Sequence, residues 1–399
     1  MNRHFIILTM GLLLLATGCG PDKNPAMITD LLKEAKAKFA PDKRTVVFDV
    51  QGELHGKTLT LRGDLHNAQL KEHLFQFLKG KVDFEIVDSI EVLPQTSLGE
   101  KTFAIVSVSV ANIRTKHDHG AEMGTQAILG TPLKVLKKER GGWYLVQTSD
   151  DYLGWTDDMI VMMTGEEYEQ WVARPKVIVT TEFGWARQSK VKGSQVVSDI
   201  VAGALLALKQ DAGTHFEVLY PDGRAAYVPR ESAQLFTAWL AHAKDTPESI
   251  ISTAKRFFGV PYLWGGTSAK GLDCSGFTKT VYYLNGVILP RDASQQALVG
   301  DDVEITPAME QVKAGDLLFF GGSAKEGKPE RVTHVAISLG GKRFIHESGD
   351  VRFNSLDPAD PDYAKNREES FLSVKRIIGA GEHAGVRRLA NIPYYRGNE

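Results

Sequence analysis

The sequence predicts a multidomain α+β protein. Its 399 residues exceed the roughly 100–200 residues of an ordinary domain, so several folding units are expected. Helical and strand periodicities alternate near the N-terminus, short strand-like runs fill the middle, and mixed periodicity returns toward the C-terminus. We expect a small α+β unit over 20–99, two β-barrels over 100–172 and 173–245, and an α+β domain over 246–399.

Composition excludes several classes of protein. Hydrophobic residues make up 43% and charged residues 24%, which excludes wholesale disorder and a polytopic membrane protein. The 47 lysines and arginines against 49 aspartates and glutamates give a formal net charge of −2. Because no excess of positive charge exists, a nucleic-acid partner is not expected. The 38 glycines and 16 prolines indicate many turns and therefore substantial β structure.

Residues 1–19 have the pattern of an export signal. A basic start at Asn2-Arg3-His4 precedes an apolar run, Phe5 to Leu15, that is too short to span a bilayer. Ala16-Thr17-Gly18 before Cys19 resembles the lipobox of bacterial lipoproteins, although leucine is commoner where Ala16 stands. We expect a lipid on Cys19 to anchor an exported protein to the bacterial cell envelope, facing the periplasm or the cell surface. The alternative is a plain secretory signal. No other segment is apolar enough to span, so this lipid would be the membrane contact.

The N-terminal unit combines helical and strand patterns. After Asn24-Pro25, apolar residues recur at helical spacing from Met27 to Phe39, and a second helical stripe runs from Leu70 to Leu78. Strands are expected around 46–50, 59–61 and 84–92. These residues carry no recognisable chemistry.

The middle of the chain makes two weakly similar passes of short strands. The first runs through 104–113, 126–136, 143–147 and 152–155, and the second through 177–181, 198–208, 215–220 and 223–228. Each pass ends on a glycine-aromatic strand, and polar turns separate the strands. The pattern resembles bacterial SH3 domains in tandem, which implies two SH3-like β-barrels.

Cys274 is the candidate nucleophile of the C-terminal domain. If Cys19 is lipidated, Cys274 is the only thiol of the mature chain and cannot form an internal disulfide. Phe277, Val281 and Leu284 follow it at helical spacing, which places Cys274 in the first turn of a helix.

The start of a helix should favour the thiolate. Unpaired backbone N–H groups and the positive end of the helix dipole can lower a cysteine pKa from about 8.5 by one to several units. The same N–H groups can stabilise the oxyanion of an acyl-transfer intermediate. We expect Asp273 to cap this helix, while its charge slightly opposes that of the sulfur.

His334 and His346 are the candidate partners of the thiol, because histidine can hold a proton near neutral pH. His334 lies in a strand over 332–339, and glycines at 340 and 341 lead into the segment of His346. A two-residue turn would place the two histidines on opposite faces. An odd-length loop, such as Gly340–Lys342 with a bulge, would place His346 opposite Ala336 and diagonal to His334, where it could orient His334.

Two other interpretations apply to residues of these types. A lone strand histidine is usually a half-exposed surface residue. A Cys-His-His zinc site would require closely spaced ligand pairs, whereas these residues are scattered between 274 and 346. We therefore expect no metal and no cofactor. The run His117-Asp118-His119 is interpreted as a polar loop between strands.

Several motifs of the C-terminal domain resemble the NlpC/P60 family in order and spacing. They are Tyr262-x-Trp264-Gly265-Gly266, Asp273-Cys274-Ser275-Gly276-Phe277, Gly315–Phe320, His334–Ile337 and His346. This family comprises papain-like cysteine peptidases that cut cell-wall peptides. The resemblance covers roughly residues 248–380 and implies Cys274 as nucleophile, His334 as base and His346 as the residue that orients the base.

Tandem barrels ahead of such a domain resemble the YkfC-type γ-D-glutamyl-L-diamino acid endopeptidases. That resemblance implies a murein stem peptide with a free N-terminal L-Ala, closed in by Tyr152, Ser275 and Asp292. A glutamate is expected just before Thr125, but Gly124 stands there, and Glu122 is the candidate substitute. The predicted substrate-binding residues are Tyr152, Tyr262, Asp273, Ser275, Asp292 and Ala293.

Three hypotheses on function follow. The first is a lipid-anchored monomeric cysteine endopeptidase that hydrolyses the γ-D-Glu–diamino acid bond of wall-derived peptides and releases L-Ala-D-Glu during murein peptide recycling. The second is a wall-binding protein with an inactive peptidase domain. The third is a D,L-endopeptidase that acts on intact peptidoglycan.

Overall fold

The computed structural model describes residues 23–325, 329–382 and 385–396. The predicted signal segment and the predicted lipid site, Cys19, lie outside the described residues. The chain divides into two compact units, one formed by residues up to Lys43 with Val47–Val92, the other by Arg44–Val46 with the chain from Leu93 onward. Within the described ranges, none of the helices combines the length and the apolar character needed to cross a bilayer.

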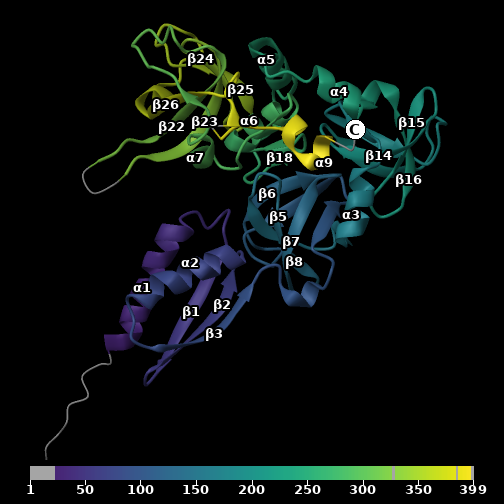
Figure 1. Cartoon of the computed structure of the whole chain (residues 1–399). Coiled ribbons are helices and arrows are strands. Elements are labelled where there is room, and N and C mark those ends of the chain that lie inside the picture. The colour runs from purple at the N-terminus through teal and green to yellow at the C-terminus, as the bar shows by residue number, and fades with distance from the viewer. Residues whose placement is uncertain (1–22, 326–328, 383–384, 397–399) are drawn as a thin grey trace, which may run out of the picture. The chain divides into compact units, whose positions relative to one another are not determined.

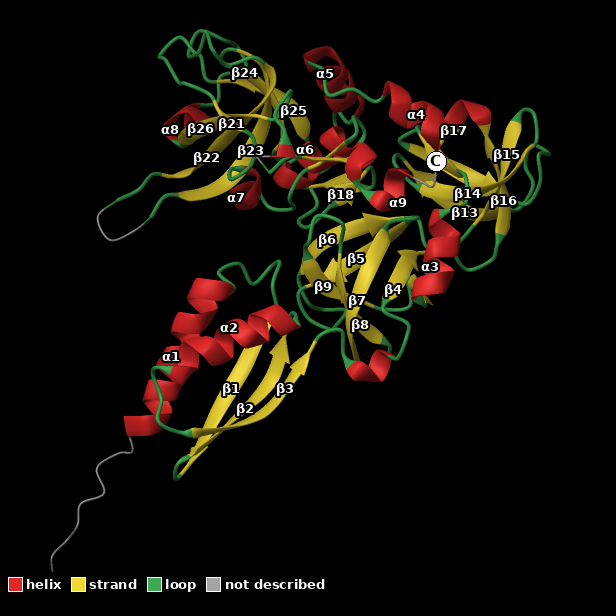
Figure 2. Cartoon of the chain, viewed as in Figure 1, coloured by secondary structure: helices red, strands yellow, loops and turns green. Residues whose placement is uncertain are grey.

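The first unit packs helices against a small sheet. Its strands are in the order β1-β2-β3, with β1 and β2 antiparallel and β2 and β3 parallel through the crossover helix α2. Figure 2 shows α1 and α2 against this sheet. The bounds are α1 Lys23–Phe39, β1 Phe48–His55, β2 Thr58–Leu65, α2 Ala68–Lys79 and β3 Glu85–Val92. The elements lie at the positions that periodicity predicts.

The second unit begins with an antiparallel sheet in the order β10-β4-β7-β8-β9-β5-β6. The predicted runs 104–113 and 126–136 are each split into two strands, because the chain turns at 107–109 and 129–131. The bounds are β4 Phe103–Val106, β5 Val110–Arg114, β6 Met123–Ile128, β7 Pro132–Glu139, β8 Trp143–Gln147, β9 Leu153–Thr156 and β10 Ile160–Met163, followed by helix α3, Gly165–Val172. Strand β10 and helix α3 were not predicted.

A second antiparallel sheet repeats this plan in the order β13-β12-β16-β15-β14-β11-β17. The predicted run 198–208 is again two strands, since the chain turns between Val201 and Leu205. The bounds are β11 Lys176–Val179, β12 Phe183–Arg187, β13 Val196–Val201, β14 Leu205–Asp211, β15 His215–Leu219, β16 Ala225–Pro229, β17 Ala233–Leu235 and α4 Phe236–His242. Both sheets are SH3-like, as the resemblance implied.

The C-terminal domain is built on a sheet in the order β21-β26-β22-β23-β24-β25 (Figure 1). Its strands are β21 Asp301–Asp302, β22 Ala314–Gly322, β23 Arg331–Gly340, β24 Arg343–Glu347, β25 Val351–Ser355 and β26 Phe371–Arg376. The helices are α5 Pro247–Arg256, α6 Cys274–Tyr283, α7 Ala293–Gln296, α8 Lys365–Glu369 and α9 Pro393–Arg396. Two short pairs, β18 Thr267–Ser268 with β19 Gly271–Leu272 and β20 Val287–Ile288 with β27 Arg387–Arg388, complete it.

Both faces of the central strand β23 are buried. Val335 and Ile337 pack with Phe277 of α6 in one apolar cluster, whereas Ala336 packs with Phe344 in another. The alternation predicted for 332–339 is therefore correct, and the face that carries His334 is covered as well.

The register between β23 and β24 decides the placement of the histidines. Ile337 pairs with Ile345 and Ser338 with Phe344, and a bulge separates these pairs from the pair of Gly340 with Arg343. The extra residue is Leu339, within the strand, rather than part of a three-residue loop. This odd offset puts His334 and His346 on one face, as the second of the two predicted registers requires.

Candidate functional site

Cys274 opens helix α6 because its neighbours close the first turn around it. Asp273 is the N-cap, and its Oδ1 accepts the N–H of Gly276 at 2.7 Å. A Cβ on Gly276 would lie 1.9 Å from the carbonyl oxygen of Gly266, so only glycine allows this close approach. The motif Asp-Cys-Ser-Gly thus encodes both the cap and the tight seat of α6. The predicted capping role of Asp273 is confirmed.

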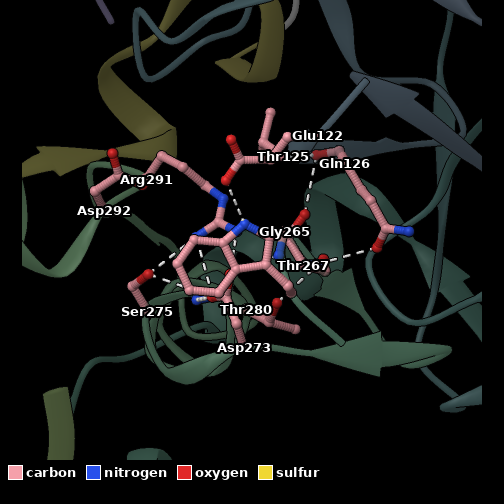
Figure 3. A network of polar contacts seen from close by, with 12 residues as sticks. Glu122, Thr125, Gln126, Gly265, Thr267, Asp273, Ser275, Thr280, Arg291 and Asp292 are labelled. Atoms are coloured by element: carbon pink, nitrogen blue, oxygen red, sulfur yellow. Dashed lines mark hydrogen bonds and ion pairs between the residues drawn. The ribbon is translucent and has the colours of Figure 1, made fainter. Parts of the chain in front are cut away.

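Arg291 holds the start of α6 from the side of α7. Its guanidinium donates to both oxygens of Asp273, at 2.5 and 3.1 Å, and to Oγ of Ser275 at 2.9 Å (Figure 3). Only 2% of Arg291 is exposed, so the pair is shielded from water. Sequence reasoning missed Arg291, although it precedes the predicted Asp292. The signal that could have found it is an arginine next to a predicted binding aspartate.

The thiol of Cys274 is not held as a thiolate. Burial, followed by the carboxylate of Asp273, raises its pKa to about 11, although backbone hydrogen bonds from Val335 and Ser275 act in the opposite direction. Only 8% of Cys274 is exposed. The predicted lowering of this pKa was therefore wrong, because burial outweighs the helix terminus. The bond from the backbone of Val335 places the sulfur against β23, the strand that also contains His334.

A chain of hydrogen bonds fixes the tautomers of both histidines. Asn354 donates its Nδ2–H to the carbonyl of Asp362 at 2.8 Å, so its Oδ1 faces Nε2 of His346 at 2.9 Å. Nε2 of His346 must then carry the proton, which leaves its Nδ1 as acceptor for Nε2–H of His334 at 2.8 Å. The free lone pair of His334 is therefore on Nδ1. Asn354 and Asp362 were not predicted.

Both imidazoles are neutral at neutral pH. Burial, then His346 and Arg367, hold the pKa of His334 well below its usual 6.5. Burial lowers the pKa of His346 to about 4, although the hydrogen bond that His346 donates to Oδ1 of Asn354 acts in the opposite direction. The resting pair is thus a neutral thiol and a neutral imidazole. Such a pair can act by general-base catalysis, in which the thiol loses its proton as it attacks.

The first SH3-like sheet contributes Tyr152 and Gly124 to one side of the site. Tyr152 is buried, and burial, with the charge of Asp292, raises its pKa to about 12. A Cβ on Gly124 would lie 3.2 Å from Cε1 of Tyr152 and 3.4 Å from its hydroxyl oxygen. Position 124 therefore faces Tyr152, and no carboxylate is supplied there. Glu122 accepts the indole N–H of Trp264 at 2.7 Å.

Further hydrogen bonds join this sheet to the C-terminal domain. Oε1 of Gln126 accepts the backbone N–H of Thr267 and the hydroxyl of Ser268, both at 3.1 Å, and its carbonyl accepts the hydroxyl of Thr267 at 3.0 Å. Figure 3 shows Thr125 and Gln126 on the same side of the network as Glu122. These hydrogen bonds hold the first SH3-like sheet against the domain that contains Cys274.

The remaining predicted binding residues surround Arg291 and Cys274. Asp292 precedes α7, and Ala293 at the start of α7 is buried. Tyr262 is 37% exposed, and burial followed by the nearby Cys274 raises the pKa of its hydroxyl. Asp292 accepts a hydrogen bond from Arg44 at 2.8 Å, a contact that no sequence pattern indicated.

Nε2 of His334 and Nδ1 of His346 hydrogen-bond to each other, so these two nitrogens are not placed to share a metal ion. In the described part of the chain, no cluster of three or more histidine, cysteine, aspartate or glutamate side chains could hold a metal ion. The run His117-Asp118-His119 lies in an exposed loop between β5 and β6, as predicted.

Acyl transfer through a thiol is the chemistry that this arrangement can perform, and the chain is a hydrolase of the cysteine-peptidase class. It belongs to the NlpC/P60 family, whose model matches residues 259–367. The bacterial dipeptidyl-peptidase SH3 domain matches residues 113–158, within the first SH3-like sheet.

Relatives and solved structures cover most of the chain. It is 30% identical over 268 residues to a gamma-D-glutamyl-L-lysine dipeptidyl-peptidase of Bacillus cereus, a match that spans 64% of this chain and 76% of the relative. It is 28% identical over 289 residues to dipeptidyl-peptidase 6 of Lysinibacillus sphaericus, spanning 69% and 99%. A crystal structure of an NlpC/P60 family protein from Bacillus cereus matches with a TM-score of 0.58 and 25% identity, covering 69% of this chain and 99% of that one.

Proposed function

We propose that this peptidase hydrolyses the γ-D-Glu–diamino acid bond of peptidoglycan-derived stem peptides and releases L-Ala-D-Glu from peptides that begin with L-Ala. The observation that carries the proposal is the hydrogen-bonded chain from Asn354 through His346 to His334, which leaves Nδ1 of His334 as its proton acceptor, in a domain where Cys274 opens α6. The names of the relatives, which specify a gamma-D-glutamyl-L-lysine bond, support the choice of substrate. Recycling of murein peptides is the proposed role.

The proposed reaction has two halves. Sγ of Cys274 attacks the γ-carbonyl carbon of D-Glu as Nδ1 of His334 takes the thiol proton. Backbone N–H groups in the first turn of α6 stabilise the oxyanion. The tetrahedral intermediate collapses when His334 returns the proton to the amine of the diamino acid, which leaves. A water molecule, deprotonated by His334, then hydrolyses the thioester.

The peptide is proposed to bind on the side where the first SH3-like sheet meets α6 and α7. Ser275 there is fixed by Arg291, and Tyr152 contributes a hydroxyl from the barrel. The full proposed binding set remains Tyr152, Tyr262, Asp273, Ser275, Asp292 and Ala293.

Turnover of a defined tripeptide tests the proposal. Cys274→Ala and His334→Ala should each abolish release of L-Ala-D-Glu from L-Ala-γ-D-Glu-L-Lys, because the nucleophile or its base is missing. His119→Ala is the matched control, since its side chain is 78% exposed in a loop, and it should retain full activity. Product analysis by mass spectrometry identifies the bond. Unchanged turnover in the Cys274→Ala protein would refute the assignment.

Two alternatives are separated by the choice of substrate. An enzyme for intact peptidoglycan would digest whole sacculi faster than the free tripeptide, and an inactive wall-binding protein would bind either without turnover. A slow reaction with iodoacetamide does not distinguish them, because burial alone raises the pKa of Cys274 to about 11.

We also propose attachment to the cell envelope through a lipid on Cys19. The support is the pattern of residues 1–19 in the sequence. Cys19→Ser should move the expressed protein from the detergent-soluble membrane fraction to the aqueous fraction. If the variant stays with the membrane, the lipid is not the anchor.

A further inference from the structure

The segment Arg44–Val46 inserts a positive charge at the end of the site where Asp292 lies. It stands between α1 and β1 in sequence but belongs to the larger compact unit. The carbonyl of Arg44 accepts the N–H of Leu153 at 2.7 Å, and that of Thr45 accepts Nε2–H of Gln147 at 3.0 Å. These bonds seat the segment on the first SH3-like sheet, directly beside Tyr152.

From this seat the side chain of Arg44 reaches α7. Its Nη1 donates to Oδ2 of Asp292 at 2.8 Å and to Oγ of Ser294 at 2.9 Å. The side chains of Arg44 and Asp292 are 31% and 29% exposed, so a ligand can reach the pair. The charges of Asp292 and Arg44 act in opposite directions on the pKa of Tyr152, which places all three groups at one end of the site.

The charges at this end are balanced without a ligand. Arg291 is paired with Asp273, and Arg44 with Asp292. Gly124, which faces Tyr152, supplies no further carboxylate. Asp273 and Asp292 thus each already have a guanidinium partner, so an ammonium group that enters here must compete with Arg44 for Asp292.

We propose that Arg44 is a specificity-determining residue that makes this site accept peptides whose N-terminus is acylated and therefore neutral. This inference rests on the proposed function and narrows its substrate class. The acyl carbonyl accepts a hydrogen bond from the guanidinium of Arg44, and Asp292 stays paired. A free α-ammonium gains little over an amide here, because Arg44 cancels the attraction of Asp292.

The test compares substrates that differ only at the N-terminus. They are L-Ala-γ-D-Glu-L-Lys, its N-acetyl form and its N-acetylmuramyl form, the last distinguishing a glycan-linked end from a simple acyl end. In the wild-type protein kcat/KM for the free and N-acetyl peptides should agree within about threefold. Arg44→Ala should raise the preference for the free peptide about five- to tenfold, mainly through KM. The change is modest because a partly exposed ion pair has a small interaction free energy. Arg44→Lys keeps the charge and should keep the wild-type ratio.

Further variants exclude a merely structural effect. Arg230→Ala breaks an Arg–Asp pair with Asp211 in the second SH3-like sheet and should leave the ratio unchanged. Asp292→Asn combined with Arg44→Ala should remove the regained preference. A ratio that Arg44→Ala does not move, or equal losses on all peptides, overturns the proposal.

Calorimetric binding to the Cys274→Ala protein separates this inference from the proposed cleavage. If the wild-type protein cleaves none of the peptides, the proposed function fails, while the affinities of the free and N-acetyl peptides still decide the role of Arg44. A tenfold tighter binding of the free peptide to the wild-type sequence in this background would refute the inference.

Discussion

At the scale of single residues, Asn354 determines which nitrogen of the base His334 is free to accept a proton. Asn354 determines which nitrogen of His346 carries the proton, and His346 in turn determines which nitrogen of His334 is free. Asn354 acts as a positioning residue in this sense. Its amide orientation is fixed because Nδ2 donates to the carbonyl of Asp362.

Replacing Asn354 should therefore reduce kcat without removing the nucleophile. Asn354→Leu eliminates the acceptor for His346 and should lower kcat about 100-fold, the lower end of what a positioned general base contributes. Asn354→Asp keeps an acceptor and should restore most of kcat. Its negative charge raises the pKa of the histidines, so the acid limb of the kcat/KM profile should move to higher pH. A leucine variant with full kcat would contradict the assigned tautomers.

Because burial raises the pKa of Cys274, its thiol should react slowly with alkylating agents at neutral pH. With a pKa of about 11, Cys274 is about 0.01% ionised at pH 7. Alkylation of the free enzyme by iodoacetamide should therefore rise about tenfold per pH unit between pH 7 and 10. Glutathione, a free thiol, serves as control and should level off near pH 9. A rate for Cys274 that levels off below pH 9 would mean that the sulfur is held as a thiolate.

At the scale of elements, the periodicity of apolar residues predicted helices and strands. It did not predict the ion pairs and the burial that arise when distant elements pack. Helix α6 follows from Phe277 and Val281 at helical spacing, and its cap follows from Asp273. The pairing of Arg291 with Asp273 and of Arg44 with Asp292 could not be predicted, because the paired side chains meet only after distant segments pack. The pKa of the thiol was misjudged for the same reason, since burial depends on the strands that cover α6.

Helix α6 is also fixed to the first SH3-like sheet by an ion pair. Nζ of Lys279 lies 2.8 Å from Oδ2 of Asp150, and the two side chains are 17% and 7% exposed. Lys279→Met leaves the carboxylate of Asp150 without this partner and should lower the free energy of unfolding by about 3 kcal/mol. Lys209→Met, which breaks an ion pair of Lys209 whose side chain is 50% exposed, is the control and should cost less than about 1 kcal/mol. Equal costs in urea denaturation would show that the buried pair is not needed.

At the scale of the whole molecule, the buried site groups shape the stability of the fold against pH. Glu347 follows His346 in β24, and within the described residues neither of its carboxylate oxygens has a hydrogen-bond partner. Burial, then Asp350, raises its pKa from 4.5 to about 8. The folded protein therefore holds a proton on Glu347 that the unfolded chain releases above pH 4.5, and this contribution to stability is lost as pH rises toward 8.

The two histidines act in the opposite direction. Their pKa values lie below 6.5 in the folded protein, so the unfolded chain binds more protons than the folded one just below pH 6.5, and stability rises with pH there. Because two histidines act against one Glu347, stability should rise with pH up to about pH 6.5. Above pH 6.5 these two histidines are neutral in both states while Glu347 still titrates, so stability should fall as pH rises toward 8. The maximum is thus expected near pH 6.5.

Urea denaturation between pH 5 and 7.5 measures both limbs. Glu347→Gln should flatten the decline above pH 6.5, because glutamine neither loses a proton nor carries a charge into the buried site. His346→Gln should halve the number of histidines that titrate and flatten the rise below pH 6.5. Lys176, whose pKa burial lowers to about 8, contributes only above that pH and leaves this window undisturbed. A decline above pH 6.5 that persists in the Glu347→Gln protein would assign the stored proton to another group.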